Sequence, residues 1–145
     1  MDLLKTIVSW VPPLLEGAQV TILLTLVSVS AGLVGSLFLA LGKMSKKKIL
    51  NRISGAYIFF FRGTPLLMQL YFIYYGLPQI TPLLTINNRF IAAFIAFALN
   101  SAAYCAEIIR AAIQSIDKGQ FEAARALGMN YSQTMSLIII PQSRS

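Results

Sequence analysis

The feature that most constrains this chain is a stretch without any charged residue between Glu16 and Lys43. A helix that crosses the hydrocarbon core of a bilayer needs about 20 apolar residues. The segment 17–42 is long enough to cross with some tilt. Two of its glycines, Gly32 and Gly35, are the small residues that membrane helices use for close contact. We therefore expect the segment 17–42 to span a membrane.

Two further segments meet the same requirement. We expect a second span over 54–77, with a kink near Gly63–Pro65 because proline interrupts a helix. The prolines at 78 and 82 then predict a turn-rich loop. A third span is expected over 90–113. The chain is thus predicted to be an all-α membrane protein with three spans.

Polar residues inside these spans leave alternatives open. Arg62 either reaches toward an interface or marks a wet, functional position, because a lone charge in mid-membrane is costly. Alternatively, the segment 53–61 lies partly outside the bilayer and the second span begins at Thr64. Asn100 and Ser101 either form hydrogen bonds between helices or line a path for a polar solute.

The composition agrees with a membrane protein and excludes several activities. Of the 145 residues 57% are hydrophobic and 12% are charged, against about 45–50% and about 25% in soluble domains. The chain has no His and a single Cys, Cys105, so it has no His-based catalysis, no internal disulfide and no Cys or His cluster for a metal. It also lacks a glycine-rich phosphate loop ending in Gly-Lys-Ser/Thr. We therefore expect no enzyme activity, no bound ATP, no cofactor and no metal.

The basic residues predict the orientation in the membrane. Five of them lie between the first two spans: Lys43, Lys46, Lys47, Lys48 and Arg52. The next connection holds only Arg89, and basic residues return after the third span. The positive-inside rule places the Lys-rich loop and the C-terminal segment in the cytoplasm and the N-terminus outside. This assignment also accounts for the net charge of +7 without a nucleic-acid partner.

The first 16 residues are too short to span and contain Trp10, Pro12 and Pro13. They lack the small-residue cleavage site of a signal peptide. We expect them to form an interfacial lead-in to the first span, with Trp10 at the level of the headgroups.

After the third span the sequence predicts a short capped helix. Asp117 is the expected N-cap, with Gln120 as its partner in a capping box, and Gly128 is the expected C-terminal cap. Ser132 is expected to cap a second helix that runs into 138–141.

The first of these helices has an apolar stripe formed by Phe121, Ala124, Leu127 and Tyr131. Such a helix either lies on the membrane surface or docks into a groove of a cytoplasmic partner.

The same segment resembles a known family. Glu122-Ala-Ala124, Gly128 after three residues and Ile138-x-Ile140-Pro141 after nine more match the EAA loop of the membrane subunits of bacterial ABC importers, EAA-x3-G-x9-I-x-L-P. Ile140 in place of Leu is the one departure. Phe61-Arg-Gly-Thr-Pro65, followed by Gln69, and Ala103-Tyr-Cys-Ala-Glu-Ile-Ile-Arg110 resemble the polar amino-acid branch of that family.

The resemblance implies a type I importer permease in the bacterial inner (cytoplasmic) membrane, with three spans here and a cytoplasmic coupling helix in the EAA loop, 114–141. It implies three partners besides the lipid bilayer: an ATP-binding cassette subunit, a second permease subunit, identical or homologous, and an extracytoplasmic amino-acid-binding protein. Residues implied in coupling to the ATPase are Glu122, Ala123, Ala124 and Gly128. Residues expected at the translocation path or in its structure are Arg62, Gly63, Thr64, Pro65, Gln69, Asn100 and Ser101.

One departure concerns length. Members of this branch usually continue for two further spans after the EAA loop, whereas this sequence ends at Ser145. We therefore expect a C-terminal truncation, and a truncated form that inserts without transporting. The alternatives are a small three-span structural or regulatory membrane protein, against which the spaced motif argues, or a non-functional fragment.

Overall fold

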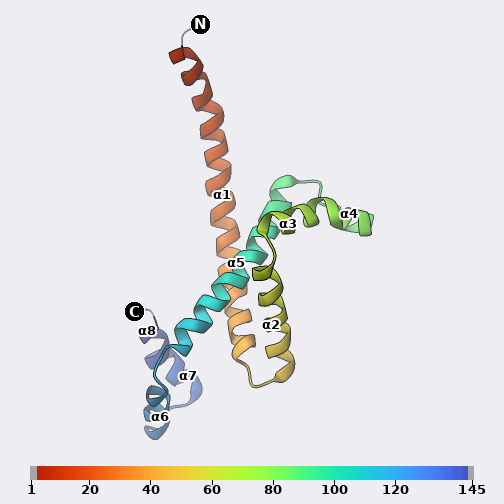
Figure 1. Cartoon of the computed structure of the whole chain (residues 1–145). Helices are drawn as coiled ribbons and strands as arrows, with labels where there is room; N and C mark the ends of the chain where they lie inside the picture. Colours follow the sequence, from red (N-terminus) through yellow and green to blue (C-terminus); the bar gives the residue numbers. More distant parts are fainter. Residues whose placement is uncertain (1–2, 144–145) are drawn as a thin grey trace.

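The computed structural model describes residues 3–143, and the side chains from Val8 onward (Figure 1). Every regular element among them is helical. The α-helices are α1 (Leu3–Met44), α2 (Lys48–Gly63), α3 (Leu66–Tyr71), α4 (Leu77–Ile80), α5 (Arg89–Gln114), α6 (Lys118–Ala126), α7 (Tyr131–Thr134) and α8 (Ile140–Gln142). Two π-helical turns, η1 (Phe72–Gly76) and η3 (Met135–Ile139), and one 3₁₀ turn, η2 (Pro82–Leu84), connect them.

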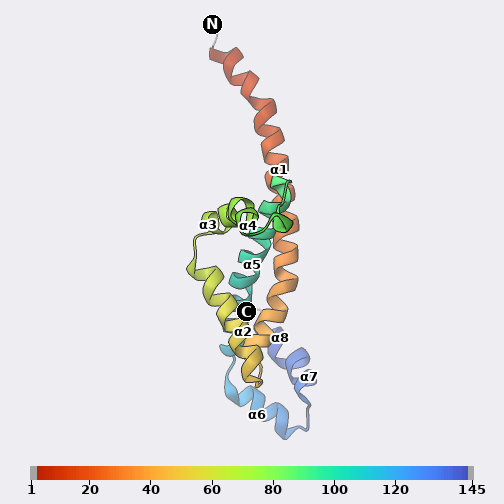
Figure 2. The same cartoon turned by 90° about the vertical axis from the view of Figure 1, so that its right-hand side faces the viewer.

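The first helix is longer than expected. It runs for 42 residues and contains the whole predicted span 17–42. The predicted interfacial lead-in is part of the same helix, with Pro12 and Pro13 inside it. Proline lacks an amide donor and bends a helix, and α1 curves in its N-terminal part (Figure 2). The lead-in and the first span are thus one continuous helix.

The third predicted span is α5, whose 26 residues closely match the expected range 90–113. Its N-terminus is capped by Asn88, whose side chain accepts hydrogen bonds from the amides of Phe90 at 2.8 Å and Ile91 at 3.3 Å. The helix crosses α1, and both contribute small residues that are buried: Ser28, Ser36 and Ala40 on α1, and Ala102, Ala103 and Ala106 on α5. Small side chains let the two backbones approach closely, as is usual between membrane helices.

The second predicted span, 54–77, is not one helix. It breaks at the expected place, between Gly63 and Leu66, but the two parts differ in direction by 104°. The 16 residues of α2 rise about 24 Å at 1.5 Å per residue, which is less than the ~30 Å of a hydrocarbon core. The described chain therefore has two helices long and apolar enough to cross a membrane, or three if the bent pair is one span.

Each π-helical turn ends two residues before a proline. η1 ends at Gly76, two residues before Pro78, and η3 ends at Ile139, two residues before Pro141. A proline ring clashes with the carbonyl group four residues earlier in a regular α-helix. A wider turn at that point relieves the clash, so the chain continues as a helix through each proline.

The Lys-rich loop and the segment that resembles the EAA loop come together in the fold (Figure 1), and much of the remaining surface is apolar. The loop from α1 to α2 and the segment α6–α8 lie at the same end, opposite the N-terminus (Figures 1 and 2). Large apolar side chains along α1, such as Leu26 at 61% and Phe38 at 73%, are exposed in the isolated chain. So much exposed apolar surface fits lipid or neighbouring subunits and does not fit water.

Candidate functional site

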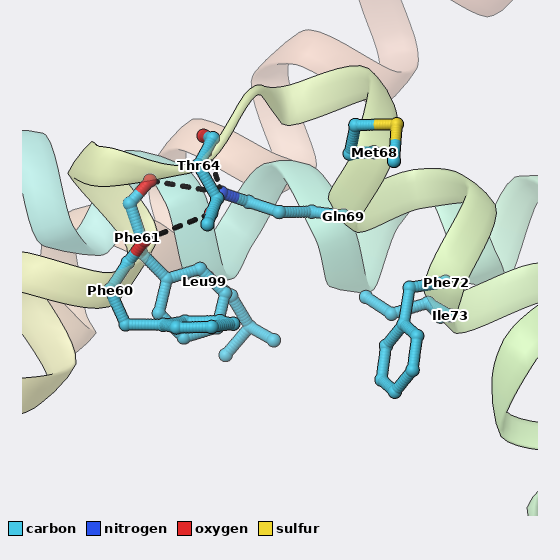
Figure 3. A pocket seen from close by; sticks show the side chains of 8 residues that line it. All are labelled: Phe60, Phe61, Thr64, Met68, Gln69, Phe72, Ile73 and Leu99. Atoms are coloured by element: carbon cyan, nitrogen blue, oxygen red, sulfur yellow. Dashed lines mark hydrogen bonds between the residues drawn. The ribbon is translucent and has the colours of Figure 1, made fainter.

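Three polar side chains with predicted roles, Thr64, Gln69 and Asn100, meet at the break between α2 and α3. Figure 3 shows the first two of them. The amide nitrogen of buried Gln69 donates to the carbonyl oxygens of Phe61 at 2.9 Å and Thr64 at 3.0 Å. It also donates to the Thr64 hydroxyl at 2.7 Å. Asn100 reaches in from α5 and donates to the Phe61 carbonyl and to the Gln69 side-chain oxygen, both at 3.2 Å.

This cluster supplies donors to two of the open carbonyl groups at the end of α2, those of Phe60 and Phe61. The last four carbonyl groups of a helix have no donor within the helix, and α2 ends at Gly63. The Thr64 hydroxyl donates to the Phe60 carbonyl at 2.9 Å. The side-chain amides of Gln69 and Asn100 both donate to the Phe61 carbonyl. An unpaired backbone carbonyl inside a bilayer costs several kcal/mol. The cluster therefore lowers the cost of breaking the helix at this point in an apolar environment.

A hollow of about 330 Å³ opens beside the cluster, between α2, α3, η1 and α5. Besides Thr64 and Gln69 its walls are apolar: Phe60, Phe61, Met68, Phe72, Ile73 and Leu99. Phe60 and Phe72 lie on opposite sides of it (Figure 3). The Gln69 amide is engaged by protein partners, so the hollow offers mainly aromatic and aliphatic surface to a neighbour.

Arg62 is not a lone charge. Its guanidinium lies 3.8 Å from a carboxylate oxygen of Glu107 on α5, and 5.4 Å from the centre of the Tyr104 ring. Glu107 also pairs with Arg110, whose Nε donates to it at 3.0 Å. The Arg62 side chain is 41% exposed and that of Glu107 is 24% exposed. This charged group joins the end of α2 to α5 a second time, beside the hydrogen bonds of Asn100.

Ser101 does not join the residues at the break. It faces α1, where a Cβ built on Gly32 would lie only 2.8 Å from the Cβ of Ser101. Pro65 stands at the start of α3 and Gly63 at the end of α2, and no atom lies within 4 Å of a Cβ built on Gly63. The contacts of Asn100 and Ser101 are thus contacts between helices, and a path-lining role for them stays a prediction.

Helix α6, in the segment that resembles the EAA loop, begins and ends where the sequence predicts. The Asp117 side chain accepts from the Gly119 amide at 2.6 Å and so caps α6. Gly128 has φ +76°. Its amide donates to the Arg125 carbonyl at 2.9 Å, and the Met129 amide donates to the Ala124 carbonyl at 3.1 Å. These two bonds form a Schellman motif, which requires a left-handed residue and favours glycine.

Two details of capping differ from the prediction. The capping box lies at α7 and not at α6: the side chain of Asn130 accepts from the Gln133 amide at 2.9 Å, and the Gln133 side chain accepts from the Asn130 amide at 3.0 Å. Ser132 lies inside α7 and is not its cap. Gln120 instead accepts a hydrogen bond from Gln142 at 3.2 Å, which connects α6 to α8.

The expected apolar stripe of α6 is divided between two surroundings. Ala124 is fully buried, and α6 contacts η3, where Ile139 is fully buried too. Leu127 and Tyr131 remain exposed, at 79% and 66%. Glu122 and Ala123 are exposed as well. The small size of Ala124 therefore serves packing within this segment, while Glu122, Ala123 and Leu127 remain available to a partner.

Some of these contacts escaped the sequence analysis. The link from Glu107 to Arg110 was visible as an i,i+3 pair of opposite charges, a spacing that brings side chains together on a helix. The link from Arg62 to Glu107 had no local signal, because it depends on how α2 packs against α5. Among residues 3–143, no three His, Cys, Asp or Glu side chains are placed to hold a metal ion.

The comparisons with known proteins agree with this architecture. Residues 32–145 match the family model of the binding-protein-dependent transport system inner membrane component. The chain is 47% identical over 132 residues to the probable amino-acid ABC transporter permease protein YckA of Bacillus subtilis (strain 168), an alignment that covers 91% of this chain and 57% of YckA. It is 44% identical over 133 residues to the arginine transport system permease protein ArtQ of the same organism, covering 92% of this chain and 60% of ArtQ.

A solved structure is also similar. The chain shares 45% identity and a TM-score of 0.89 with a structure described as the crystal structure of an amino acid ABC transporter with histidines. The match covers 99% of this chain and 65% of that chain. The chain thus spans about three fifths of the length of these relatives. It belongs to the family of inner membrane components of binding-protein-dependent transport systems.

Proposed function

We propose that the chain is the membrane subunit of an ATP-driven amino-acid importer in the bacterial inner membrane. Its helices form part of the translocation path, and a separate ATP-binding subunit hydrolyses ATP. The family match supports this proposal, as do relatives at 41–49% identity that are named as amino-acid permeases. A second permease subunit and an extracytoplasmic amino-acid-binding protein complete the proposed complex.

The observation that carries the coupling proposal is the exposed face of α6. Both ends of α6 are fixed, by the Asp117 cap and by the Schellman motif at Gly128. Its buried side contains Ala124, so Glu122, Ala123 and Leu127 face outward. A short rigid helix with a free face at the Lys-rich end of the molecule suits docking into a groove of a cytoplasmic ATPase.

The contacts also provide a route from α6 to the membrane-embedded break. Only residues 115–117 separate α5 from α6, so a displacement of α6 acts directly on α5. Asn100 and Glu107, both on α5, hold the α2–α3 break through Phe61, Gln69 and Arg62. Movement of the ATPase would therefore shift the two halves of the broken helix relative to each other. We propose that this break, with Arg62, Gly63, Thr64, Pro65 and Gln69, borders the path.

Charge reversal on the free face of α6 tests the coupling role. The chain is produced with the ATP-binding subunit of its own transport system, and the ATPase that co-purifies is measured. We expect Glu122→Lys to lower the recovered ATPase by about ten-fold or more, because misplacing a charge in a buried interface costs several kcal/mol. Glu16→Lys is the matched control, since Glu16 is an exposed acid on α1 far from α6.

The transport role is tested by placing the same variants in a permease that also carries the two spans expected after the EAA loop. Uptake of a labelled panel of amino acids is then measured with the ATPase and binding protein supplied. Glu122→Lys should lose uptake and Glu16→Lys should retain it. Equal ATPase recovery with both variants would contradict docking through α6. Uptake of none of the amino acids by a complex that assembles normally would contradict the proposed substrate class.

A further inference from the structure

The loop from α1 to α2 concentrates positive charge without any acid. Lys43, Lys46, Lys47, Lys48 and Arg52 lie within ten residues, and the sequence has no Asp or Glu between Glu16 and Glu107. Orientation in the membrane requires this charge to be on one side of the bilayer. It does not require the side chains to surround a common space.

In the structure three of these basic side chains line a common, shallow hollow. A hollow of about 310 Å³ is lined by Ser45, Lys46, Lys48, Asn51 and Arg52. No carboxylate lines it, and among the described residues no ion pair involves Lys46, Lys48 or Arg52. Three cations that face one hollow without a counter-ion repel each other. The arrangement is therefore suited to an anion.

The loop itself is held by polar contacts that do not use these cations. The Asn51 side chain donates to the Lys43 carbonyl, and the Lys47 amide donates to the Ser45 hydroxyl at 3.2 Å. The turn between the two helices is fixed by these bonds. Lys46, Lys48 and Arg52 are exposed, so their charged groups are free to contact a ligand.

The neighbours of the hollow indicate what kind of anion it meets. Ile49 is 73% exposed and Ile53 is 64% exposed, and each directly follows a basic residue that lines the hollow, Lys48 or Arg52. Uncovered aliphatic side chains directly beside uncovered cations are typical of the boundary between acyl chains and headgroups. A soluble acidic partner would leave this apolar surface uncovered.

We propose that the hollow formed by residues 45–52 binds the phosphate of an anionic phospholipid, with Lys46, Lys48 and Arg52 on the headgroup and Ile49 and Ile53 against the acyl chains. Basic clusters next to a membrane helix attract anionic lipids. The hollow makes this attraction local, so that one lipid is held at one place. The proposal does not depend on the amino acid carried or on the ATPase.

A tryptophan reporter beside the hollow tests this binding. The native Trp10 is replaced by Trp10→Phe, and Ile49→Trp places the reporter at an exposed apolar position. The chain is reconstituted into dioleoylphosphatidylcholine vesicles that contain either brominated phosphatidylglycerol or brominated phosphatidylcholine, and quenching of the reporter is measured. We expect about five-fold or greater preference for phosphatidylglycerol at this position.

Two variants with the same loss of charge make the test specific. Lys48→Gln with Arg52→Gln should reduce the preference nearly to one. Arg89→Gln with Arg125→Gln, which removes two exposed basic residues elsewhere, should leave it unchanged. Lys48→Arg with Arg52→Lys should keep it, because the charges remain.

Several results would overturn the proposal. Equal quenching by the two brominated lipids would show that no anionic headgroup is preferred. A preference that both double variants retain would reflect the overall basic charge of the chain. If millimolar inorganic phosphate reduced the quenching by brominated phosphatidylglycerol as strongly as unlabelled phosphatidylglycerol does, the hollow would be a site for free anions. Loss of ATPase recovery in Lys48→Gln with Arg52→Gln, with the lipid preference unchanged, would assign the cluster to a protein partner.

Discussion

At the scale of single residues, the contact between α1 and α5 depends on positions where a side chain is absent or very small. A Cβ on Gly32 would lie 2.8 Å from the Cβ and 2.9 Å from the hydroxyl oxygen of Ser101, and 3.1 Å from the backbone carbonyl oxygen of Ala98. A Cβ on Gly35, one turn further, would meet only the Ala102 Cβ, at an ordinary 3.4 Å. Two glycines on one helix face therefore differ in what they tolerate.

We expect Gly32→Ala to loosen the packing of α1 on α5, because overpacking a close contact costs about 1–3 kcal/mol. Cys105 is the only thiol and is half-buried, so its reaction with a thiol dye during heating reports the opening of the fold. The apparent melting temperature should fall by several degrees for Gly32→Ala. It should stay the same or rise slightly for Gly35→Ala, since alanine favours the helix.

Ser101→Gly provides a second check, because it removes both side-chain atoms that the new methyl group meets. Combined with Gly32→Ala, it should restore part of the lost stability. Equal melting of Gly32→Ala and Gly35→Ala would contradict the close approach at Gly32.

At the scale of elements, the sequence predicts where the second span breaks, between α2 and α3, but not the angle between these two helices. Pro65 cannot continue α2, and its effect on the preceding residue is local, so the position of the break could be predicted. The angle of 104° is set by donors that arrive from elsewhere in the chain. Asn100 lies on another helix, and its reach to Phe61 and Gln69 leaves no pattern in the sequence around Pro65.

The same distinction holds for α6 and α7. The Asp117 cap and the Gly128 turn follow from neighbours in the sequence, so both could be predicted. The choice of Asn130 over Ser132 as the next cap decides where α7 begins, and both residues are good caps. Only the reciprocal partner Gln133, three residues after Asn130, distinguishes them.

The polar cluster at the break gives a prediction for this element. Gln69→Leu removes the donor of the Thr64 carbonyl and one of the two donors of the Phe61 carbonyl. We expect a loss of about 1–3 kcal/mol in the free energy of unfolding, which is the cost of buried groups left unpaired. Titration of the detergent-solubilised chain with sodium dodecyl sulfate, followed by circular dichroism, measures this loss.

Gln69→Leu and Asn100→Leu should not be additive, because the two side chains bond to each other and share the Phe61 carbonyl. A coupling of about 0.5 kcal/mol or more is expected in the double-mutant cycle. Ser115→Ala, at the far end of α5, should be additive with Gln69→Leu. Additivity in both cycles would show that Asn100 does not hold the break.

At the scale of the whole molecule, charge and architecture give the same orientation. The Lys-rich loop and α6 lie at one end, and the loop that contains η2 lies away from that end, in the half nearer the N-terminus (Figures 1 and 2). Because the Lys-rich loop and α6 lie at one end, the proposed headgroup site and the proposed ATPase contact lie on the same side of the membrane. The positive-inside rule predicts that this side is the cytoplasm.

Cysteine labelling in intact cells tests this orientation. On a Cys105→Ala background, Ser45→Cys marks the Lys-rich loop while leaving every basic residue in place, and Ser132→Cys marks α7. Leu83→Cys marks the opposite loop, where Leu83 is 93% exposed. A membrane-impermeant maleimide should label position 83 in intact cells. It should label positions 45 and 132 only after permeabilisation, because five basic residues hold their end of the molecule inside. Labelling of position 45 in intact cells, with position 83 protected, would invert the orientation. It would also move α6 out of reach of any cytoplasmic ATPase.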